Sequence, residues 1–388
     1  MDANTPNSSR GFTGRAGLCY NRITFAGETG HTESKERWNM DEKCLKFHNA
    51  AEVAPSPSGL RMYRFPRAVC DAMGMPGRLY GRYVAQTTTG CEIRFVTDAD
   101  RVRLSLTSLD EDGYVEVFRG DYRYYQGYSY LFPVRRGQVT HLTPTRSEGF
   151  DGKDPSLLRR PGGFSHEVWR VLSDINCTLA LVDFEAFGGN VRPPRADEEP
   201  EKTLLCYGTS ISYGACASAQ PVAWCQLLGR LLNVNLLNKG MGGSCLNEAG
   251  VADYFASDAV HFDAILLENS VNMGGMYEEY ERRTSYLLER LSACKPETPV
   301  FLLTSFPNGS NVLPGAACPV VKGGRAEGNL RTDEILRALS RRYPQARLIE
   351  GGEMLDDLTG LTCDMIHLSD YGHIQAATRL AEALRGKF

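Results

Sequence analysis

The sequence lacks the features that mark membrane-spanning and nucleic-acid-binding proteins. No stretch of its 388 residues approaches the roughly 18 consecutive apolar residues that a membrane-spanning helix needs. It has no long basic run, and its net charge is −4, so neither a membrane nor a nucleic acid is expected as a partner. The first residues show no basic region followed by an apolar one, as a secretory signal would, and we expect a cytoplasmic protein.

The twelve cysteines lack the spacing of a metal site or a redox motif. None of them forms a Cys-x-x-Cys pair, and several, such as Cys177 and Cys206, lie inside apolar runs. Without a secretory signal, reduced and buried thiols are expected. No cluster of His, Cys and carboxylate residues has metal-ligand spacing, so neither a metal nor a cofactor is predicted.

What the sequence does contain is enough apolar material for two domains. Hydrophobic residues make up 42% of the chain and charged residues 23%, which is typical of globular proteins. Residues 1–75 are polar and predict an irregular lead-in packed on a sandwich domain at 76–190. Gly, Pro and charged residues crowd together over 187–202, so a linker is expected at 191–202. A catalytic domain would then cover 203–388.

Residues 80–186 alternate polar and apolar side chains, as half-buried strands do. Many short strands separated by Gly, Asp and Pro predict an antiparallel sandwich of jelly-roll type. The run at 110–113 has the composition of a hairpin turn. Strands are predicted at 92–97, 101–106, 114–119, 122–130, 139–142, 167–172 and 178–184.

A cluster of five tyrosines lies between residues 122 and 130. Tyrosine favours strands, so we interpret the cluster as a strand that fills the sandwich or the domain interface. The alternative is a surface on which a sugar or another substrate stacks.

After residue 203, five strand-like runs alternate with helical segments. This pattern predicts a parallel sheet covered by helices on both faces, with all carboxyl ends of the strands at one edge. The strands are expected at 203–207, 234–237, 264–267, 300–304 and 347–349, and the helices at 222–232, 277–294, 331–342 and 374–384.

The loops that follow these strands carry the candidate site residues. Ser210 follows the first strand, and the second leads into a glycine-rich loop that includes Gly243. Asn272 follows the third strand. Near the C-terminus, Asp364 stands three residues before His367. Each motif alone is compatible with an ordinary turn or helix cap, but all four are expected at one sheet edge.

Together these segments resemble the SGNH (GDSL-type) hydrolase family, in the family's order and over 203–388. The resemblance implies an α/β catalytic domain with a flavodoxin-like three-layer αβα fold and a five-stranded parallel sheet. It also implies Ser210 as nucleophile, His367 as base and Asp364 as its orienting acid. The oxyanion hole would comprise the N–H groups of Ser210 and Gly243 and the side chain of Asn272.

Two motifs depart from the family pattern. The first block reads Gly-Thr-Ser instead of Gly-Asp-Ser, and the third reads Ser-Val-Asn-Met instead of Gly-Thr-Asn-Asp. The third block therefore keeps the asparagine but loses the carboxylate after it. This departure bears on the hydrogen bonding of the loop more than on the chemistry.

A sandwich ahead of such a domain resembles two arrangements, a branch with an acyltransferase of tetracycline-type polyketide biosynthesis and the family 2 carbohydrate esterases. The function expected by resemblance is a serine esterase acting on a small-molecule or carbohydrate ester with a small acyl group, such as acetyl. An acyltransferase and a carbohydrate-binding protein with an idle site are the alternatives. An oligomer is compatible with the sequence.

Other residues compete for these roles. Ser212 is expected to point away from the site, and Ser244 to cap a helix. His373 is expected to be structural, and Asp370 is the rival partner of His367. Cys216 and Cys245 lie near the motifs, but no second histidine is placed to activate a thiolate. Finally, the long loop at 306–325 is predicted to form a pocket wall or lid.

Overall fold

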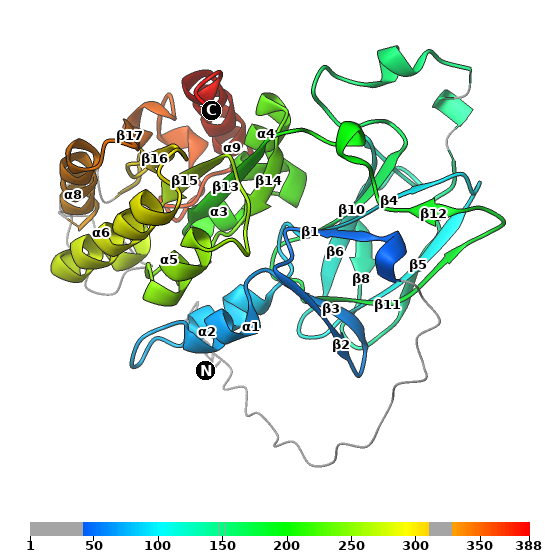
Figure 1. Cartoon of the computed structure of the whole chain (residues 1–388), viewed down its shortest axis with the longest axis horizontal. Coiled ribbons are helices and arrows are strands. Elements are labelled where there is room, and N and C mark those ends of the chain that lie inside the picture. Colours follow the sequence, from blue (N-terminus) through cyan, green and yellow to red (C-terminus); the bar gives the residue numbers. More distant parts are fainter. Residues whose placement is uncertain (1–41, 147, 151, 310–327) are drawn as a thin grey trace, which may run out of the picture. The chain divides into compact units, whose positions relative to one another are not determined.

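The computed structural model in Figure 1 describes residues 42–146, 148–150, 152–309 and 328–388. The first part of the predicted lead-in and most of the predicted lid at 306–325 lie outside the described residues. The N-terminal half contains two antiparallel sheets and the C-terminal half one parallel sheet of five strands. The predicted fold class, a β-sandwich followed by an α/β domain, is therefore confirmed.

The two antiparallel sheets pack face to face as a sandwich. Alternate residues of both sheets point inward, among them Phe95, Leu104, Val117 and Leu181, and these residues form one buried core. The first sheet has the order β1 (Lys46–His48), β4 (Glu92–Thr97), β10 (Val168–Ser173), β6 (Gly113–Arg119) and β7 (Tyr122–Arg123), with β12 (Val191–Arg192) beside β4 and β8 (Phe132–Val134) beside β6. The second has the order β2 (Glu52–Ser56), β3 (Gly59–Tyr63), β11 (Leu179–Ala186), β5 (Val102–Ser108) and β9 (Thr140–Leu142).

The segment at 42–86 is more regular than the sequence predicts. Where an irregular lead-in is expected, β1, β2 and β3 join the two sheets of the sandwich. Helices α1 (Arg67–Ala72) and α2 (Tyr80–Gln86) follow, and buried residues of both helices belong to the core of the α/β domain. The short strands and interspersed prolines conceal this regularity. In addition, β1 and β3 pair with the distant strands β4 and β11, although β2 and β3 form a local hairpin.

Two local predictions in the sandwich are wrong. The turn at 110–113 joins β5 to β6, which lie in different sheets, so it is no hairpin. The tyrosine-rich strand ends at Arg123, because Gly127 and Tyr128 adopt left-handed backbone conformations in a turn. Tyr128 is 97% exposed and Tyr125 is also exposed, so these two do not fill the sandwich. Tyr124 does pack against the sandwich core, with its ring on Phe132 and Trp169.

The predicted linker is packed against its surroundings. Within 191–202, β12 pairs with β4, and the carboxylates of Glu198 and Glu199 are buried. Glu198 accepts hydrogen bonds from the side chain of Arg192 and from the backbone N–H of Arg195. The charged residues of this segment suggest a free linker in the sequence. In the structure, local ion pairs of this kind neutralise them. The predicted domain limits remain predictions.

The parallel sheet has the strand order 2-1-3-4-5, which is that of a flavodoxin-like fold. Side chains alternate between its faces, so Leu205 and Tyr207 pack on one side and Leu204 and Cys206 on the other. Its strands are β14 (Asn235–Asn238), β13 (Thr203–Gly208), β15 (Ala264–Glu268), β16 (Val300–Leu303) and β17 (Ala346–Ile349), each end within one residue of its predicted position.

Helices cover both faces of this sheet, as Figure 1 shows. The first face carries α5 (Ala249–Ala256), α6 (Tyr277–Cys294) and α8 (Gly328–Arg342). The second face carries α4 (Trp224–Leu232) and α9 (Asp370–Leu384). A short helix, α3 (Ser210–Tyr213), begins just beyond the end of β13, which lies between β14 and β15. Because β13 lies beside the crossover of the strand order, α3 stands where such sheets build their sites.

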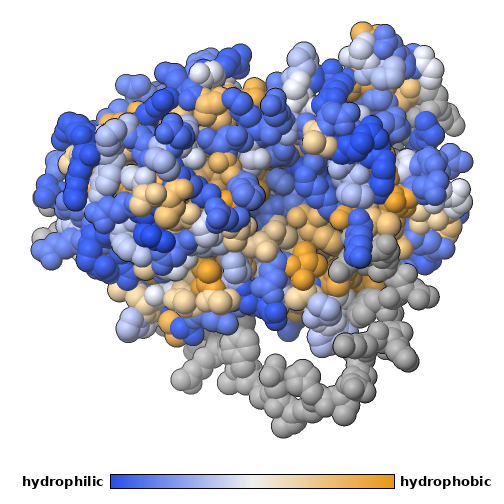
Figure 2. Space-filling model, viewed as in Figure 1, coloured by the Kyte–Doolittle hydropathy of each residue, from blue (hydrophilic) through white to orange (hydrophobic). Residues whose placement is uncertain are grey.

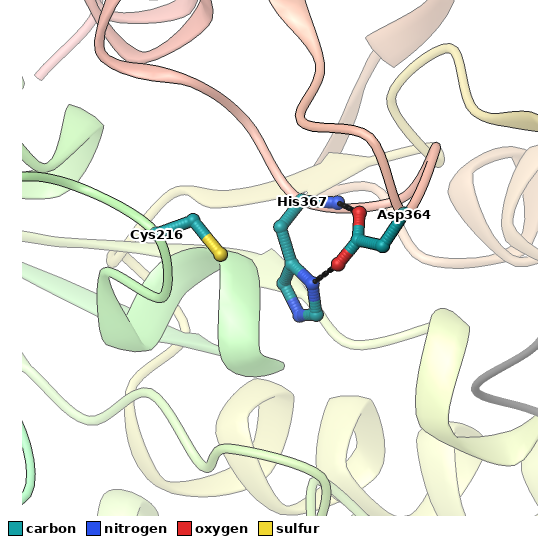
Figure 3. A group of neighbouring side chains, drawn as sticks. All are labelled: Cys216, Asp364 and His367. Atoms are coloured by element: carbon teal, nitrogen blue, oxygen red, sulfur yellow. Dashed lines mark hydrogen bonds and ion pairs between the residues drawn. The ribbon is translucent and has the colours of Figure 1, made fainter. Parts of the chain in front are cut away.

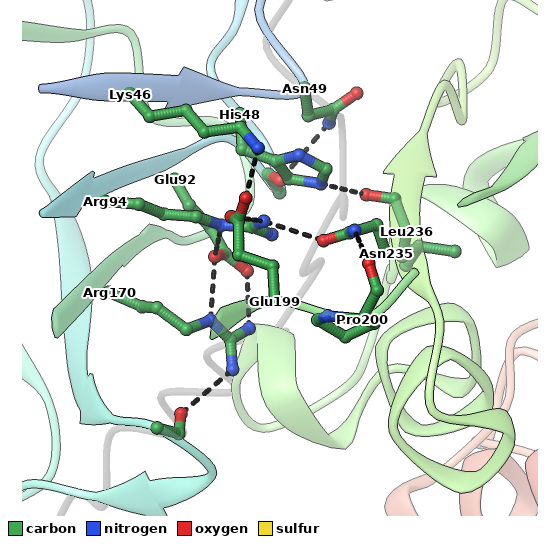
Figure 4. A network of polar contacts seen from close by, with 12 residues as sticks. Lys46, His48, Asn49, Glu92, Arg94, Arg170, Glu199, Pro200, Asn235 and Leu236 are labelled. Carbon is green, nitrogen blue, oxygen red and sulfur yellow. Dashed lines mark hydrogen bonds and ion pairs between the residues drawn. The ribbon is translucent and has the colours of Figure 1, made fainter. Parts of the chain in front are cut away.

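Buried charges join the sandwich to the α/β domain (Figure 4). The guanidinium of Arg94 on β4 donates to Glu92, to Glu199 and to the side chain of Asn235 at the start of β14, each at 2.7 Å. Arg170 on β10 donates to both carboxylate oxygens of Glu92 at 2.6 and 2.8 Å. Each buried charge has an opposite partner, and this pairing offsets part of the cost of its desolvation.

The surface drawn in Figure 2 is mainly hydrophilic, with apolar side chains in small groups between the charged ones. Among the described residues, no helix has the length and apolar character that crossing a membrane requires.

Candidate active site

Ser210 lies at the first position of α3, two residues after the end of β13. Thr209 caps the helix, since its side chain accepts a hydrogen bond from the N–H of Ile211. The N–H of Ser210 itself stands in the first helical turn, where backbone donors have no partner within the helix. The strand-to-helix turn therefore presents the hydroxyl and the N–H of the same residue at the sheet edge.

The structure brings Ser210, His367 and Asp364 into one chain of hydrogen bonds. The Oγ atom of Ser210 lies 2.7 Å from Nε2 of His367. Nδ1 of the same ring lies 2.6 Å from Oδ2 of Asp364 (Figure 3). The carboxylate thus fixes the ring so that Nε2 faces the serine, and this nitrogen is free to accept a proton.

The second oxygen of Asp364 is held by its own loop. Oδ1 accepts hydrogen bonds from the hydroxyl of Thr362 at 2.7 Å and from the N–H groups of Ile366 and His367 at 2.9 and 3.0 Å. Burial acts to raise the pKa of Asp364, but the hydrogen bonds from His367, Thr362 and Ile366 outweigh it and lower the pKa to about 2. The side chain is therefore ionised at neutral pH.

Asn272 lies in a short 3₁₀ turn (Val271–Met273) after β15. Its Oδ1 accepts the backbone N–H of Cys245 at 3.0 Å. Because Oδ1 accepts this hydrogen bond, the NH₂ group of the amide remains as a donor for a substrate. The same bond connects the asparagine to the glycine-rich loop.

The glycine-rich loop packs tightly on the nucleophile turn. The N–H of Met241 donates to the carbonyl of Gly208 at 2.8 Å, and a Cβ atom at Gly240 would lie 2.3 Å from the N atom of Tyr213. Only glycine allows the loop to come this close. Gly243 has φ +65°, and the space beside its Cα is open. Close packing therefore requires glycine at position 240, and the left-handed backbone conformation favours glycine at position 243.

A buried carboxylate that the sequence analysis did not single out lies beneath the nucleophile. Glu268, the last residue of β15, accepts hydrogen bonds from the N–H and hydroxyl of Thr209 at 3.0 and 2.9 Å. It also accepts the hydroxyl of Ser212 at 2.8 Å. Burial raises the pKa of Glu268 to about 7, against the effect of these bonds. Its place at the end of an apolar strand gives no sequence sign of this role.

The competing residues take other positions. Ser212 is buried on Glu268 and points away from His367. Asp370 accepts the N–H of Ser218 at 2.7 Å. His373 is buried, and its Nδ1 accepts the N–H of Trp224 at 3.2 Å, so it has a structural role.

Ser244 does not cap a helix, contrary to expectation. It is buried, and α5 begins five residues later, at Ala249, after Glu248. The intervening residues form an irregular loop in which Cys245 is buried. The helix begins late because this loop first passes beneath Asn272, through the Cys245 hydrogen bond.

Cys216 lies beside the histidine, as Figure 3 shows. Its thiol, an imidazole nitrogen of His367 and a carboxylate oxygen of Asp364 lie within 4.8 Å of one another, so the three could in principle supply ligands to a metal. The short hydrogen bonds of His367 to Ser210 and Asp364 already engage both ring nitrogens. Burial and the charge of Asp364 raise the pKa of Cys216, so the thiol is a poor nucleophile.

Part of the chain matches a known family. Residues 201–385 match the GDSL-like lipase/acylhydrolase family. No curated protein sequence is detectably similar to the chain.

Several solved structures share the fold of both domains at low sequence identity. The salicylyl-acyltransferase SsfX3 from a tetracycline biosynthetic pathway matches with a TM-score of 0.67 and 13% identity, over 88% of this chain and 94% of that one. A family two carbohydrate esterase from Clostridium thermocellum, solved with cellohexaose, matches with a TM-score of 0.58 and 10% identity, over 88% and 98%. The acetyl xylan esterase Est2A from the rumen bacterium Butyrivibrio proteoclasticus matches with a TM-score of 0.54 and 11% identity, over 90% and 97%.

Proposed function

We propose that the GDSL-like lipase/acylhydrolase domain formed by residues 201–385 is a serine esterase that cleaves a carboxylic ester with a small acyl group, such as acetyl on a carbohydrate. The observation that carries the proposal is the continuous hydrogen-bonded chain from Ser210 through His367 to Asp364. An alcohol that is hydrogen-bonded to a correctly oriented imidazole is the arrangement that acyl transfer to serine requires.

In the first half of the reaction, Ser210 Oγ attacks the ester carbonyl while His367 Nε2 accepts the hydroxyl proton. Asp364, which stays ionised, stabilises the imidazolium that forms. The tetrahedral intermediate carries its negative charge on the former carbonyl oxygen. When it collapses, His367 returns the proton to the leaving alcohol, and the acyl group stays on Ser210.

The negative charge would be met by three donors, the N–H groups of Ser210 and Gly243 and the side-chain NH₂ of Asn272. The hydrogen bond from Cys245 to Asn272 fixes the amide orientation before substrate arrives. Preorganised donors of this kind stabilise the transition state without a reorganisation cost at the moment of reaction.

In the second half of the reaction, His367 Nε2 takes a proton from the acceptor molecule as its oxygen attacks the acyl carbon, and returns the proton to Ser210 Oγ as the acyl–serine bond breaks. If this is water, the protein is a hydrolase. The fold of the salicylyl-acyltransferase, which spans 88% of this chain, makes transfer to an alcohol the second candidate function. Both outcomes use the same residues, so the acceptor distinguishes them.

The decisive experiment compares the full chain with Ser210→Ala on p-nitrophenyl esters of increasing acyl length and on acetylated xylo-oligosaccharides. We expect turnover that favours the acetyl ester, and a fall of at least about 10³-fold in Ser210→Ala. Cys216→Ala, which removes the thiol beside His367, should keep most of the activity. Product analysis with added alcohols reports the partition between hydrolysis and acyl transfer. Near wild-type turnover in Ser210→Ala would overturn the proposal.

A further inference from the structure

We propose that the N-terminal half of the chain positions the oxyanion hole. Three of its side chains, Arg64, Thr87 and Arg78, each hold one of the segments that carry the three proposed donors. We call these residues the oxyanion clasp. The inference rests on the proposed function, because it assigns a task to residues around the same site.

Arg64 holds the glycine-rich loop. This arginine follows β3, is completely buried, and donates through Nη1 to the carbonyls of Gly240 at 2.8 Å and Asn238 at 3.3 Å. These carbonyls lie three and five residues before Gly243. The remaining guanidinium nitrogens donate to the carbonyls of Val84 and Thr87, so the side chain is fixed at both ends.

Hydrogen bonds between the glycine-rich loop and the N-terminal half run in both directions. The side chain of Asn49 donates to the carbonyl of Asn238 at 3.0 Å, and the buried Nζ of Lys239 donates back to the carbonyls of Asn49 and Arg64. Arg64 and Lys239 are thus both buried on backbone carbonyls of the opposite domain, and burial lowers the pKa of Lys239 to about 7. Charge-assisted bonds in a buried setting are strong, and losing one leaves a buried polar group unpaired.

Thr87 holds the nucleophile turn. Its hydroxyl is 2.8 Å from the hydroxyl of Tyr213, the last residue of α3, which begins at Ser210. The Tyr213 hydroxyl also donates to Asn176 of the sandwich at 3.1 Å. The short helix carrying the Ser210 N–H is therefore fixed at its far end by two residues of the N-terminal half.

Arg78 holds the third segment. It lies just before α2, and its Nη2 donates to the backbone carbonyl of Asn272 at 3.2 Å. The same guanidinium contacts the sulfur of Met276 at 3.8 Å. The contact is made to the asparagine's own backbone, so it bears on the position of the amide.

The acid and base are held differently. The hydrogen bonds recorded for the side chains of Asp364 and His367, within the described residues, all come from Thr362, Ile366, Ser210 and each other. Loosening the clasp should therefore weaken transition-state stabilisation and leave proton transfer intact. This predicts a specific kinetic signature: a lower kcat with little change in KM and an unchanged pH profile.

The experiment uses the full chain with Arg78→Gln, which removes a clasp residue, and Tyr213→Phe, which removes the hydroxyl that Thr87 holds. Both changes spare the buried guanidinium of Arg64. On p-nitrophenyl acetate, each should lower kcat by about tenfold, and the pair by about 10²-fold, with KM changed less than about threefold. Arg78→Lys should recover part of the loss. Arg135→Gln, an exposed arginine of the sandwich paired with Asp112, is the matched control and should behave as wild type.

The outcomes separate this inference from the proposed function. Wild-type kcat in both Arg78→Gln and Tyr213→Phe, or a loss of kcat that follows a lowered melting temperature and an altered pH profile, would overturn the clasp. If Ser210→Ala abolishes turnover in the same assay, the proposed function stands whichever way the clasp variants behave. If Ser210→Ala keeps its activity, the proposed function fails first.

Discussion

At the scale of single residues, Asn272 is a sharp test of the proposed chemistry, because its amide would stabilise the charged intermediate more than the neutral ester. Asn272→Ala should lower kcat by about 10²- to 10³-fold, or about 3 to 4 kcal/mol of transition-state stabilisation, with KM nearly unchanged. Steady-state kinetics on p-nitrophenyl acetate measure both constants.

A second variant shows whether this loss is electrostatic. Asn272→Asp keeps an acceptor for the N–H of Cys245 but places a carboxylate beside the developing oxyanion. Its kcat should fall at least as far as that of the alanine variant. A kcat within about threefold of wild type in both variants would exclude Asn272 from the oxyanion hole.

The site residues that the sequence predicts lie in recognisable motifs, and those that it does not predict lie in none. Ser210, Asp364 and His367 follow predicted strands in a recognisable order, and the structure joins them by hydrogen bonds. Glu268 and Arg64 have no such pattern. One ends an apolar strand and the other lies in a segment that looks irregular, and both act through contacts with residues 56 to 176 positions away.

At the scale of elements, the end of β15 and the start of α3 form one hydrogen-bonded unit around Glu268. Burial raises its pKa to about 7, above the value of about 4.5 for an exposed glutamate. The folded protein therefore holds a proton that the unfolded chain releases between these values. The contribution to stability is complete below about pH 4.5 and is lost as the pH rises towards 7.

Glu268→Gln removes this titration while keeping the acceptor that contacts Thr209 and Ser212. Relative to the variant, the wild type should lose roughly 3 kcal/mol of unfolding free energy between pH 4.5 and 7.5. Urea unfolding of both proteins at several pH values measures the difference. A constant difference across this range would show that Glu268 does not titrate there.

The local sequence pattern predicts some helices and strands correctly and others wrongly. Helix α6 and strand β4 lie where they are predicted, residue for residue, because a long amphipathic run and an alternating strand encode their own periods. The turn at 110–113 has hairpin composition, yet it joins strands of different sheets. Turn residues indicate a change of direction, but only long-range pairing decides which strand lies alongside.

At the scale of the whole molecule, the buried ion network of Figure 4 connects the sandwich to the α/β domain. Glu199 is central, since its carboxylate pairs with Arg94 at 2.7 Å and also with Lys46. Glu199→Ala leaves the buried guanidinium of Arg94 without one of its two carboxylates. Breaking a buried pair on one side costs about 3 to 5 kcal/mol.

Urea unfolding of Glu199→Ala should therefore show a loss of about this size. Glu185→Ala is the matched control, because Glu185 and its partner Arg103 are both substantially exposed. An exposed pair contributes at most about 1 kcal/mol. A similar small effect in both variants would show that the network does not hold the domains together.

The two-domain architecture was accessible from sequence because each half has its own period, two in the sandwich and mixed strand and helix after 203. The contact between the two halves could not be predicted from the sequence. Arg94, Glu199 and Lys239 look like ordinary surface charges in the sequence, and only their burial against the other domain gives them a structural role. The same holds for the oxyanion clasp.

The central claim is that Ser210 is a nucleophile activated by His367. Its most direct test is to treat the full chain with a fluorophosphonate and map the adduct by peptide mass spectrometry. A reactive serine should be labelled at Ser210, and His367→Ala should slow the labelling by at least about 10²-fold. Labelling at another residue, or none in the folded wild-type protein, would contradict the account.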